Sequence, residues 1–420
     1  MLGGMATLVE ETAIGPFIEK NFSPEFKALK RCYLCQTSIK VVFEKLLLCD
    51  ENRWKTVEGQ KAVVNNIVFC DIASKFPVAD KYVKSFLTKY FNYLMRDGSE
   101  ISDTLAEIST EVATTPTSNL PNKTSFKTYI FDICNDDLRE SETRDPVTIS
   151  LLQSTNLGNG MTTGYKIWPC SYGMTKYFLT LAAPKLDSGL DSMVAKGGNE
   201  TTSPCIQYIR DRKILEIGCG TGCIGIGLCN LPLKEQPKKL VLSDFSASVL
   251  SNMIDNVVAN GHAVSSRDHY AGSVKDYFAN KGEGGKTGGC SNQRNMQKKQ
   301  VVVEPLIFDV RDSYTSEKDL LQISTYFETV VACDMIYDVD LCRELMRTFN
   351  ILLTQNDELN ILLAMENRNA DTHVEFERCL EKYQLKIIDI IEDGRNDIKP
   401  DNTYFGQNLG AISIYQLKKS

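Results

Sequence analysis

The sequence has few histidines and no long apolar segment. Its three histidines, His262, His269 and His373, do not cluster, which gives no support for a histidine-based nucleophilic site. No run of 18 apolar residues is present, so we expect no membrane span. No basic segment precedes an apolar run in "MLGGMATLVEETAIG", so we expect no secretory signal and a cytoplasmic protein.

Positive charge is also scarce. The 47 Lys and Arg residues are outnumbered by 54 Asp and Glu residues, for a net charge of −7, whereas proteins that bind nucleic acids usually carry a basic face. We therefore expect a protein partner and no nucleic acid. We also expect a monomer. The 14 cysteines are predicted to be reduced thiols. Cys32 and Cys35 have zinc-like spacing, but no second Cys or His pair lies at a suitable distance, so we expect no metal.

The first part of the 420-residue chain has a helical pattern. Ser23 can cap a helix, Pro24 suits its first position, and apolar residues then recur at helical spacing over 26–46. A second helix is predicted over 83–95, with Gly98 as its stop. These features predict a mostly α-helical N-terminal region.

A change of composition follows. Residues 99–145 are rich in Ser, Thr, Asp and Glu, and "TTPTSNLPNK" is typical of a loop or linker. We therefore predict a smaller N-terminal domain over 1–145 and a second domain over 146–420.

The second part alternates between strand and helix patterns. The segment "VTISLLQS" is strand-like, and a helix is predicted from about Ser171. Further strands are predicted at 214–217, 239–242, 301–308, 329–333, 361–364, 385–391 and 411–417, with helices between most of them. This alternation predicts an α/β domain with a mostly parallel sheet covered on both faces.

Two stretches, near 185–205 and 265–300, are typical of surface insertions. The second stretch is locally basic. It could be a mobile loop, or it could contact an acidic partner.

The stretch "KILEIGCGTGCIGIGL" places four glycines within eight residues, between a buried strand and the first turns of a helix. Glycine allows a sharp turn and a close approach of the backbone to a ligand, and helix N–H groups point outward there, so the junction predicts a nucleotide-type cradle. A tight turn in any α/β protein is the alternative. The dinucleotide pattern G-x-G-x-x-G fails, because Cys223 follows Gly220 by three residues.

The acidic-first motif E-I-G-C-G-T-G instead resembles the S-adenosylmethionine (SAM) methyltransferases of the seven-strand class, from about Gly164 to the C-terminus. That resemblance implies a Rossmann-like fold and SAM as the cofactor. It assigns cofactor contacts to the motif residues Glu216, Gly218, Cys219, Gly220 and Gly222.

Further cofactor residues follow along the chain. Asp244 closes the next strand 22 residues after Gly222, close to the spacing of about 20 expected for a carboxylate on a ribose; a helix N-cap is the alternative. Phe245 would then pack beside the adenine. The resemblance implies that Asp309 in "LIFDVRD" faces the adenine amino group. A surface position for this aspartate is the alternative. Trp168 stands just before a predicted helix, where its ring would cover the cofactor. Packing of the ring in the protein core is an equally good interpretation.

The segment "VVACDMIYD" places Cys333, Asp334 and Tyr337 at the carboxyl end of a predicted strand, the edge where parallel sheets bind substrates. We assign Cys333 to the cofactor side. Asp-x-x-Tyr at this position resembles the seven-strand protein lysine methyltransferases, which implies Asp334 and Tyr337 as catalytic residues.

With "TTGYKIWPCSYG" and the helical N-terminal region, the chain resembles the elongation factor 2 lysine methyltransferase family. The resemblance implies trimethylation of a lysine in elongation factor 2, in translation. Residues 1–145 are predicted to recognise that protein, with a structural cap on the sheet as the alternative. Two other functions stay open: a SAM methyltransferase acting on another protein or a small molecule, and a non-catalytic binding protein with a SAM-type fold.

Overall fold

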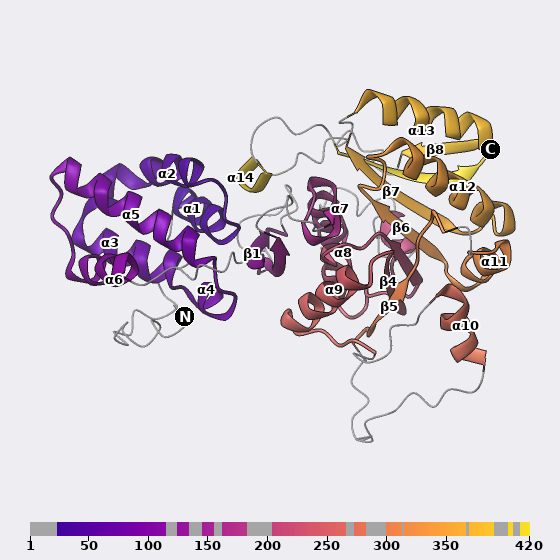
Figure 1. Ribbon diagram of the computed structural model, residues 1–420, viewed down its shortest axis with the longest axis horizontal. Coiled ribbons are helices and arrows are strands. Elements are labelled where there is room, and N and C mark those ends of the chain that lie inside the picture. Colours follow the sequence, from indigo (N-terminus) through magenta and orange to yellow (C-terminus); the bar gives the residue numbers. More distant parts are fainter. Residues whose placement is uncertain are drawn as a thin grey trace, which may run out of the picture. The chain divides into compact units, whose positions relative to one another are not determined.

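The computed structural model describes residues 23–114, 124–133, 145–154, 162–182, 204–265, 273–282, 300–312, 315–366, 369–389, 402–405 and 412–420. The chain divides into two compact units: residues 1–130, 150–161 and 401–408 form the first, and residues 131–149, 162–400 and 409–420 form the second (Figure 1). Whether these units divide substrate recognition from catalysis stays a prediction.

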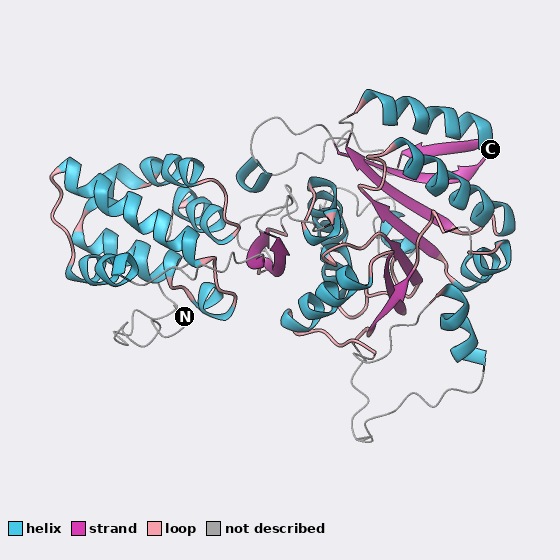
Figure 2. Ribbon diagram, viewed as in Figure 1, coloured by secondary structure: helices cyan, strands magenta, loops and turns pink. Residues whose placement is uncertain are grey.

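The first unit is built mostly from helices (Figure 2). Its α-helices are α1 (Pro24–Leu34), α2 (Ile39–Leu48), α3 (Val57–Val63), α4 (Asp71–Lys75), α5 (Asp80–Asp97), α6 (Asp103–Thr114) and α14 (Asn402–Phe405), with a 3-10 turn at Asp50–Lys55 and a π turn at Val64–Val68. Buried aromatic and aliphatic side chains of α1–α6 form one core, which includes Tyr33, Phe86 and Tyr90. Strands β1 (Thr124–Phe131) and β2 (Val147–Ser154) pair in a separate two-stranded sheet.

The predicted first helix is two helices in the structure. Ser23 caps α1 as expected, because its Oγ accepts a hydrogen bond from Phe26 N at 3.3 Å. The helix nevertheless ends at Leu34, since Gln36 takes a left-handed backbone conformation with φ of 55°. Ser38 then caps α2. The apolar spacing continued across this break, so periodicity alone did not reveal it.

The predicted second helix is confirmed as α5, which Gly98 ends with φ of 73°. The polar stretch over 99–145 contains two regular elements, α6 and β1, on either side of the predicted loop or linker segment. α6 buries Leu105 and Val112 on one face, a helical spacing that the polar composition obscured. Most of "TTPTSNLPNK" lies outside the described residues.

The second unit contains a seven-stranded sheet, as the fold prediction required. Its strands are β3 (Lys213–Ile217), β4 (Lys239–Asp244), β5 (Val303–Ile307), β6 (Thr329–Cys333), β7 (Asn360–Glu366), β8 (Leu385–Asp389) and β9 (Ile412–Lys419). The order is β5-β4-β3-β6-β7-β9-β8, and only β9 runs antiparallel to its neighbours. The mostly parallel α/β fold is therefore confirmed.

Helices cover both faces of this sheet (Figure 1). They are α7 (Pro169–Leu181), α8 (Cys223–Cys229), α9 (Ala247–Ala259), α10 (Val274–Gly282), α11 (Glu317–Tyr326), α12 (Val339–Gln355) and α13 (Ala370–Tyr383). Side chains of α10–α13 pack with Leu215, Ile217 and Val330 in one apolar core, on the face opposite α7–α9. The predicted insertion over 265–300 therefore includes a packed helix, α10, which buries Val274 and Tyr277. Residues 266–272 and 283–299, and the insertion residues up to 203, lie outside the described part.

The strand order reverses at β3. The chain proceeds outward from β3 to β4 and β5 on one side, and from β6 to β7 on the other. In open parallel sheets, the crevice at such a reversal, outside the carboxyl ends of the strands, is the usual ligand site. Among the described residues, no helix is long and apolar enough to cross a membrane.

Candidate functional site

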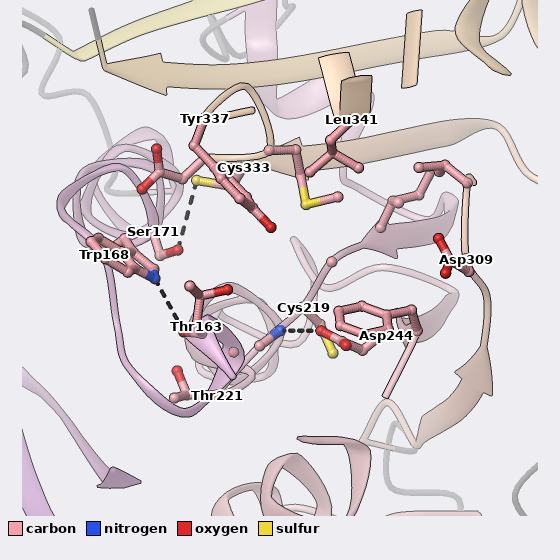
Figure 3. A pocket seen from close by; sticks show the side chains of 18 of the residues that line it. Thr163, Trp168, Ser171, Cys219, Thr221, Asp244, Asp309, Cys333, Tyr337 and Leu341 are labelled. Atoms are coloured by element: carbon pink, nitrogen blue, oxygen red, sulfur yellow. Dashed lines mark hydrogen bonds between the residues drawn. The ribbon is translucent and has the colours of Figure 1, made fainter. Parts of the chain in front are cut away.

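A cavity opens at the carboxyl ends of β3, β4, β5 and β6, where the strand order reverses (Figure 3). The space inside it, counted out to its open mouth, is about 750 Å³. The lining residues come from the segment before α7 and its first turn, from the carboxyl ends of the four strands and the segments after them, and from the start of α12: Thr163, Gly164, Lys166, Trp168, Ser171, Ile217, Gly218, Cys219, Gly220, Thr221, Asp244, Phe245, Phe308, Asp309, Val310, Arg311, Cys333, Asp334, Met335, Tyr337 and Leu341.

The glycine turn after β3 has the conformation that its sequence requires. Gly218, Gly220 and Gly222 have φ of 70°, 51° and 82°, a region that side chains rarely adopt. A Cβ on Gly218 would collide with Sδ of Met335, and one on Gly222 would approach Cγ of Met253 to 2.8 Å. Both the backbone conformation and the packing of the two methionines therefore require glycine at Gly218 and Gly222. Gly218 and Gly220 line the cavity, whereas Gly222 does not.

Asp244 joins the end of β4 to this turn. Its Oδ2 accepts a hydrogen bond from Gly220 N at 3.2 Å, and its Oδ1 accepts one from Ser246 N at 3.1 Å. Asp244 is buried, which raises the pKa of its carboxyl, while these backbone hydrogen bonds oppose the rise. The N-cap of α9 is Ser246, so Asp244 does not fill the helix-capping position weighed against its cofactor role. Contact with a ribose stays a prediction.

Phe245 and Asp309 share a partner that the sequence interpretation missed. The guanidinium of Arg311 lies 4.9 Å from the centroid of the Phe245 ring, and its Nε and Nη2 contact the Asp309 carboxylate at 3.1 and 3.2 Å. The charge of Asp309 is thus balanced by Arg311. The arginine stands two residues after Asp309 in "FDVRD", and that closeness was the one available signal.

The segment before α7 forms another wall, which contains Trp168 as predicted. The indole Nε1 of Trp168 donates to the carbonyl of Thr163 at 3.2 Å, and Nζ of Lys166 lies 5.4 Å from the centroid of the indole. Tyr165 anchors the segment to α9 by donating from its hydroxyl to the Ser248 carbonyl at 2.9 Å. The sequence interpretation identified Trp168 but not Thr163 or Lys166.

Asp334 and Tyr337 both line the cavity after β6. Asp334 is buried and has a left-handed backbone with φ of 55°, held by a hydrogen bond from its N–H to the carbonyl of Ala364 at 2.9 Å. A non-glycine residue in this conformation is strained by about 1–2 kcal/mol. Tyr337 is 47% exposed. At the end of β6, the Sγ of Cys333 accepts a hydrogen bond from the Ser171 hydroxyl at 3.7 Å.

Glu216, like Gly222, is a predicted site residue that does not line the cavity. It is 2% exposed, does not line the cavity, and burial raises the pKa of its carboxyl to about 8. A hydrogen bond from the backbone of Gly225 in α8 opposes that rise. Glu216 lies on the face covered by α8, because its neighbours Leu215 and Ile217 point into the opposite core. Burial also raises the pKa of the Cys219 thiol, which lines the cavity.

Other sequence features lie away from the cavity. His262 contacts the side-chain amides of Asn230 and Gln300, and His269 lies outside the described residues. Cys32 and Cys35 are buried at the end of α1 and form no disulfide with any residue that the structure describes. Within the described ranges, no group of three or more His, Cys, Asp and Glu residues could hold a metal.

Residues 145–272 match the family model for lysine methyltransferase. An uncharacterized protein of Dictyostelium discoideum is 26% identical over 183 residues, which cover 43% of this chain and 45% of that protein. The match thus spans less than half the length of this curated relative.

Solved structures of lower similarity were also found. A TehB-like SAM-dependent methyltransferase from Corynebacterium glutamicum is 13% identical, with a TM-score of 0.28 over 50% of this chain and 82% of that one. A ribosomal protein L11 methylase from Lactobacillus delbrueckii is 12% identical, with a TM-score of 0.27 over 53% and 82%. A precorrin-6y C5,15-methyltransferase from Geobacter metallireducens is 13% identical, with a TM-score of 0.26 over 54% and 92%. At TM-scores below 0.5, these likenesses establish neither fold nor substrate.

The family match, the seven-stranded sheet and the cavity at its reversal point support a SAM-dependent methyltransferase. The residues of the cavity fit SAM as the cofactor. Gly218 and Gly220 of the glycine turn line the cavity, a buried carboxylate stands at the end of β4, and aromatic rings stand on two walls. Each of these features suits one part of an adenosine derivative with a charged side chain.

Proposed function

We propose that this methyltransferase transfers a methyl group to the ε-amine of a protein lysine, and that elongation factor 2 is the substrate. The observation that carries the proposal is Asp334 with Tyr337 at the cavity wall, in the Asp-x-x-Tyr segment after β6. The match of residues 145–272 to the lysine methyltransferase family model supports it. The choice of elongation factor 2, and trimethylation, rest on the sequence resemblance.

Bound SAM supplies a methyl group already activated on its sulfonium. The protein must therefore orient the acceptor and obtain it in its neutral form. With a lysine pKa of about 10.4, roughly one amine in a thousand is neutral near pH 7.4, a cost of about 4 kcal/mol. Alignment of a neutral amine with the methyl carbon is the main task left to the side chains of the cavity.

Asp334 is suited to aiming the acceptor rather than to removing its proton. An anion beside an ammonium raises the amine pKa, so the Asp334 carboxylate attracts the lysine without deprotonating it. The backbone of Asp334 is fixed in its left-handed conformation by Ala364, which limits the directions its side chain can take. We assign Tyr337, half exposed on the same wall, to lining the lysine channel. Water then receives the proton.

The first unit is proposed to recognise the protein substrate. A single lysine side chain buries too little area to select one protein, since specific contacts generally need on the order of 1,000 Å² of interface. The exposed apolar side chains Leu47 and Leu48 of α2 and Met95 of α5 offer contact area on this unit. Methylation of the whole factor would then depend on both units.

The test is methyl transfer from labelled SAM to purified elongation factor 2 and, in parallel, to a cell lysate, with Asp334→Asn as the inactive control. We expect label on a lysine of the factor, located by mass spectrometry. Label on a different protein band, or in the small-molecule fraction, would replace the proposed substrate. A complete lack of transfer, with SAM bound, would indicate a non-catalytic binding protein.

A further inference from the structure

The charges that line the cavity are unequally paired. They are carried by Lys166, Asp244, Asp309, Arg311 and Asp334. Arg311 is already engaged in a bidentate ion pair with Asp309. Lys166 forms no ion pair with any residue that the structure describes, and its ammonium lies beside the Trp168 ring instead. Lys166 is therefore the cation of this wall that is free to receive an anion.

The cofactor has one anion to place. Its methionyl end ends in a carboxylate and an ammonium, whereas its adenosine end is uncharged. Besides Arg311 and Lys166, the charged side chains of the cavity are carboxylates, which would repel that anion. We propose that Lys166 binds the carboxylate of the methionyl end of SAM.

The position of Lys166 agrees with this assignment. Figure 3 shows Trp168 and Thr163 across the cavity from Asp309, the residue predicted to face the adenine. Because Lys166 lies over the Trp168 indole, its ammonium is on the Trp168 side, away from that adenine end. A cofactor with its adenine near Asp309 would thus extend its charged end toward Lys166.

The backbone that carries Lys166 is held on both sides. Trp168 donates to Thr163 at 3.2 Å, and Tyr165 donates to the Ser248 carbonyl of α9 at 2.9 Å. Gly164 packs so closely on α9 that a Cβ there would approach Val249 to 2.9 Å. Such a fixed segment loses little conformational entropy when its lysine binds a ligand, so the charge is already in place.

This inference depends on the cofactor alone and needs no lysine acceptor, so it can be tested apart from the proposed function. The measurement is calorimetric affinity of the full chain for two ligands, SAM and decarboxylated SAM, which lacks only the carboxylate. The variants are Lys166→Met, which removes the charge, and Lys166→Arg, which keeps it. Lys238→Met is the control for net charge, since Lys238 is exposed and outside the cavity.

We expect Lys166→Met to weaken binding of SAM by roughly 10- to 100-fold, the range for a hydrogen bond to a charged group, and to change binding of decarboxylated SAM by less than about twofold. Lys166→Arg and Lys238→Met should stay close to the unmodified chain with both ligands. Equal weakening of both ligands in Lys166→Met would overturn the proposal and indicate that Lys166 only supports Trp168. Unchanged affinity for SAM would overturn it as well.

Discussion

The backbone N–H of Gly220 donates a hydrogen bond to Oδ2 of Asp244 at 3.2 Å, which joins the glycine turn after β3 to the acidic end of β4. Two sequence features predicted to hold different parts of one cofactor are therefore in direct contact. The same carboxylate also accepts from Ser246, so its orientation is fixed from two sides. A rigid acceptor is thus presented to the cavity before any ligand binds.

Asp244→Ala is expected to weaken SAM binding at least about 10-fold without unfolding the chain. The substitution removes a charged hydrogen-bond acceptor, a contact of about 1.5–3 kcal/mol, and leaves Gly220 N–H without this partner. Calorimetry measures the affinity, and circular dichroism checks the fold. Unchanged affinity in the folded variant would contradict a cofactor role for Asp244.

The affinity for SAM should also fall in acid earlier than an ordinary aspartate would predict. Burial raises the pKa of Asp244 above its usual value of 3.8, so the carboxylate gains a proton at a higher pH. The acceptor is present above the pKa of the folded state and is lost as pH falls through it. Asp244→Asn should remove this pH dependence, which calorimetric titrations at several pH values would reveal.

Asp334→Asn is expected to keep SAM binding and lower methyl transfer by orders of magnitude. Asparagine tolerates the left-handed backbone that Asp334 adopts, so the fold should persist while the charge that attracts an ammonium is lost. The measurements are single-turnover transfer to the acceptor protein and thermal unfolding of each variant. Transfer at the full rate would mean that another residue holds the acceptor.

Glu216→Gln is expected to stabilise the protein at pH 8 and above. Burial raises the pKa of Glu216 from 4.5 to about 8, so between these values the folded state binds the proton more strongly than the unfolded state does. The free energy of unfolding then decreases as pH rises through this window, by up to about 1.4 kcal/mol per pH unit. Glutamine cannot ionise, so urea unfolding across pH 5–9 should show a smaller decrease in the variant.

The double variant Leu47→Glu with Leu48→Glu is expected to bind SAM normally and to methylate elongation factor 2 more slowly. These leucines are 47% and 67% exposed on α2, so charge there should disturb docking rather than folding. Val374→Glu is the matched control, since Val374 is 62% exposed on α13 of the second unit. An equal rate in the double variant would contradict recognition through this surface.

A chain shortened to begin at Asp145 is a less direct test of recognition. It would lack β1, which pairs with β2, and Phe131, which stacks on Tyr172 of α7 at 4.7 Å between ring centroids. Loss of these contacts would destabilise the second unit itself. Surface substitutions separate docking from folding more cleanly.

Local sequence was sufficient for the sheet and for the glycine turn. Apolar runs of strand length between helical patterns predicted β3 to β9 with small shifts at their ends, and the left-handed backbone at Gly218, Gly220 and Gly222 follows from residue type. Similarly, residues at the end of a strand or directly after it, such as Asp244 and Asp334, reach the cavity because parallel strands end at one edge. These properties depend on a few neighbouring residues.

Tertiary packing decided the rest. Arg311 meets Phe245, and Lys166 lines the same cavity as Asp309, only because distant segments are brought together by the sheet order, which no local pattern encodes. The helices that cover each face of the sheet decided the surroundings of Glu216. Its side chain therefore lies under α8 and not in the cavity. Sequence thus determined the conformations that each short segment prefers, whereas long-range packing of apolar faces determined which charged side chains share the site.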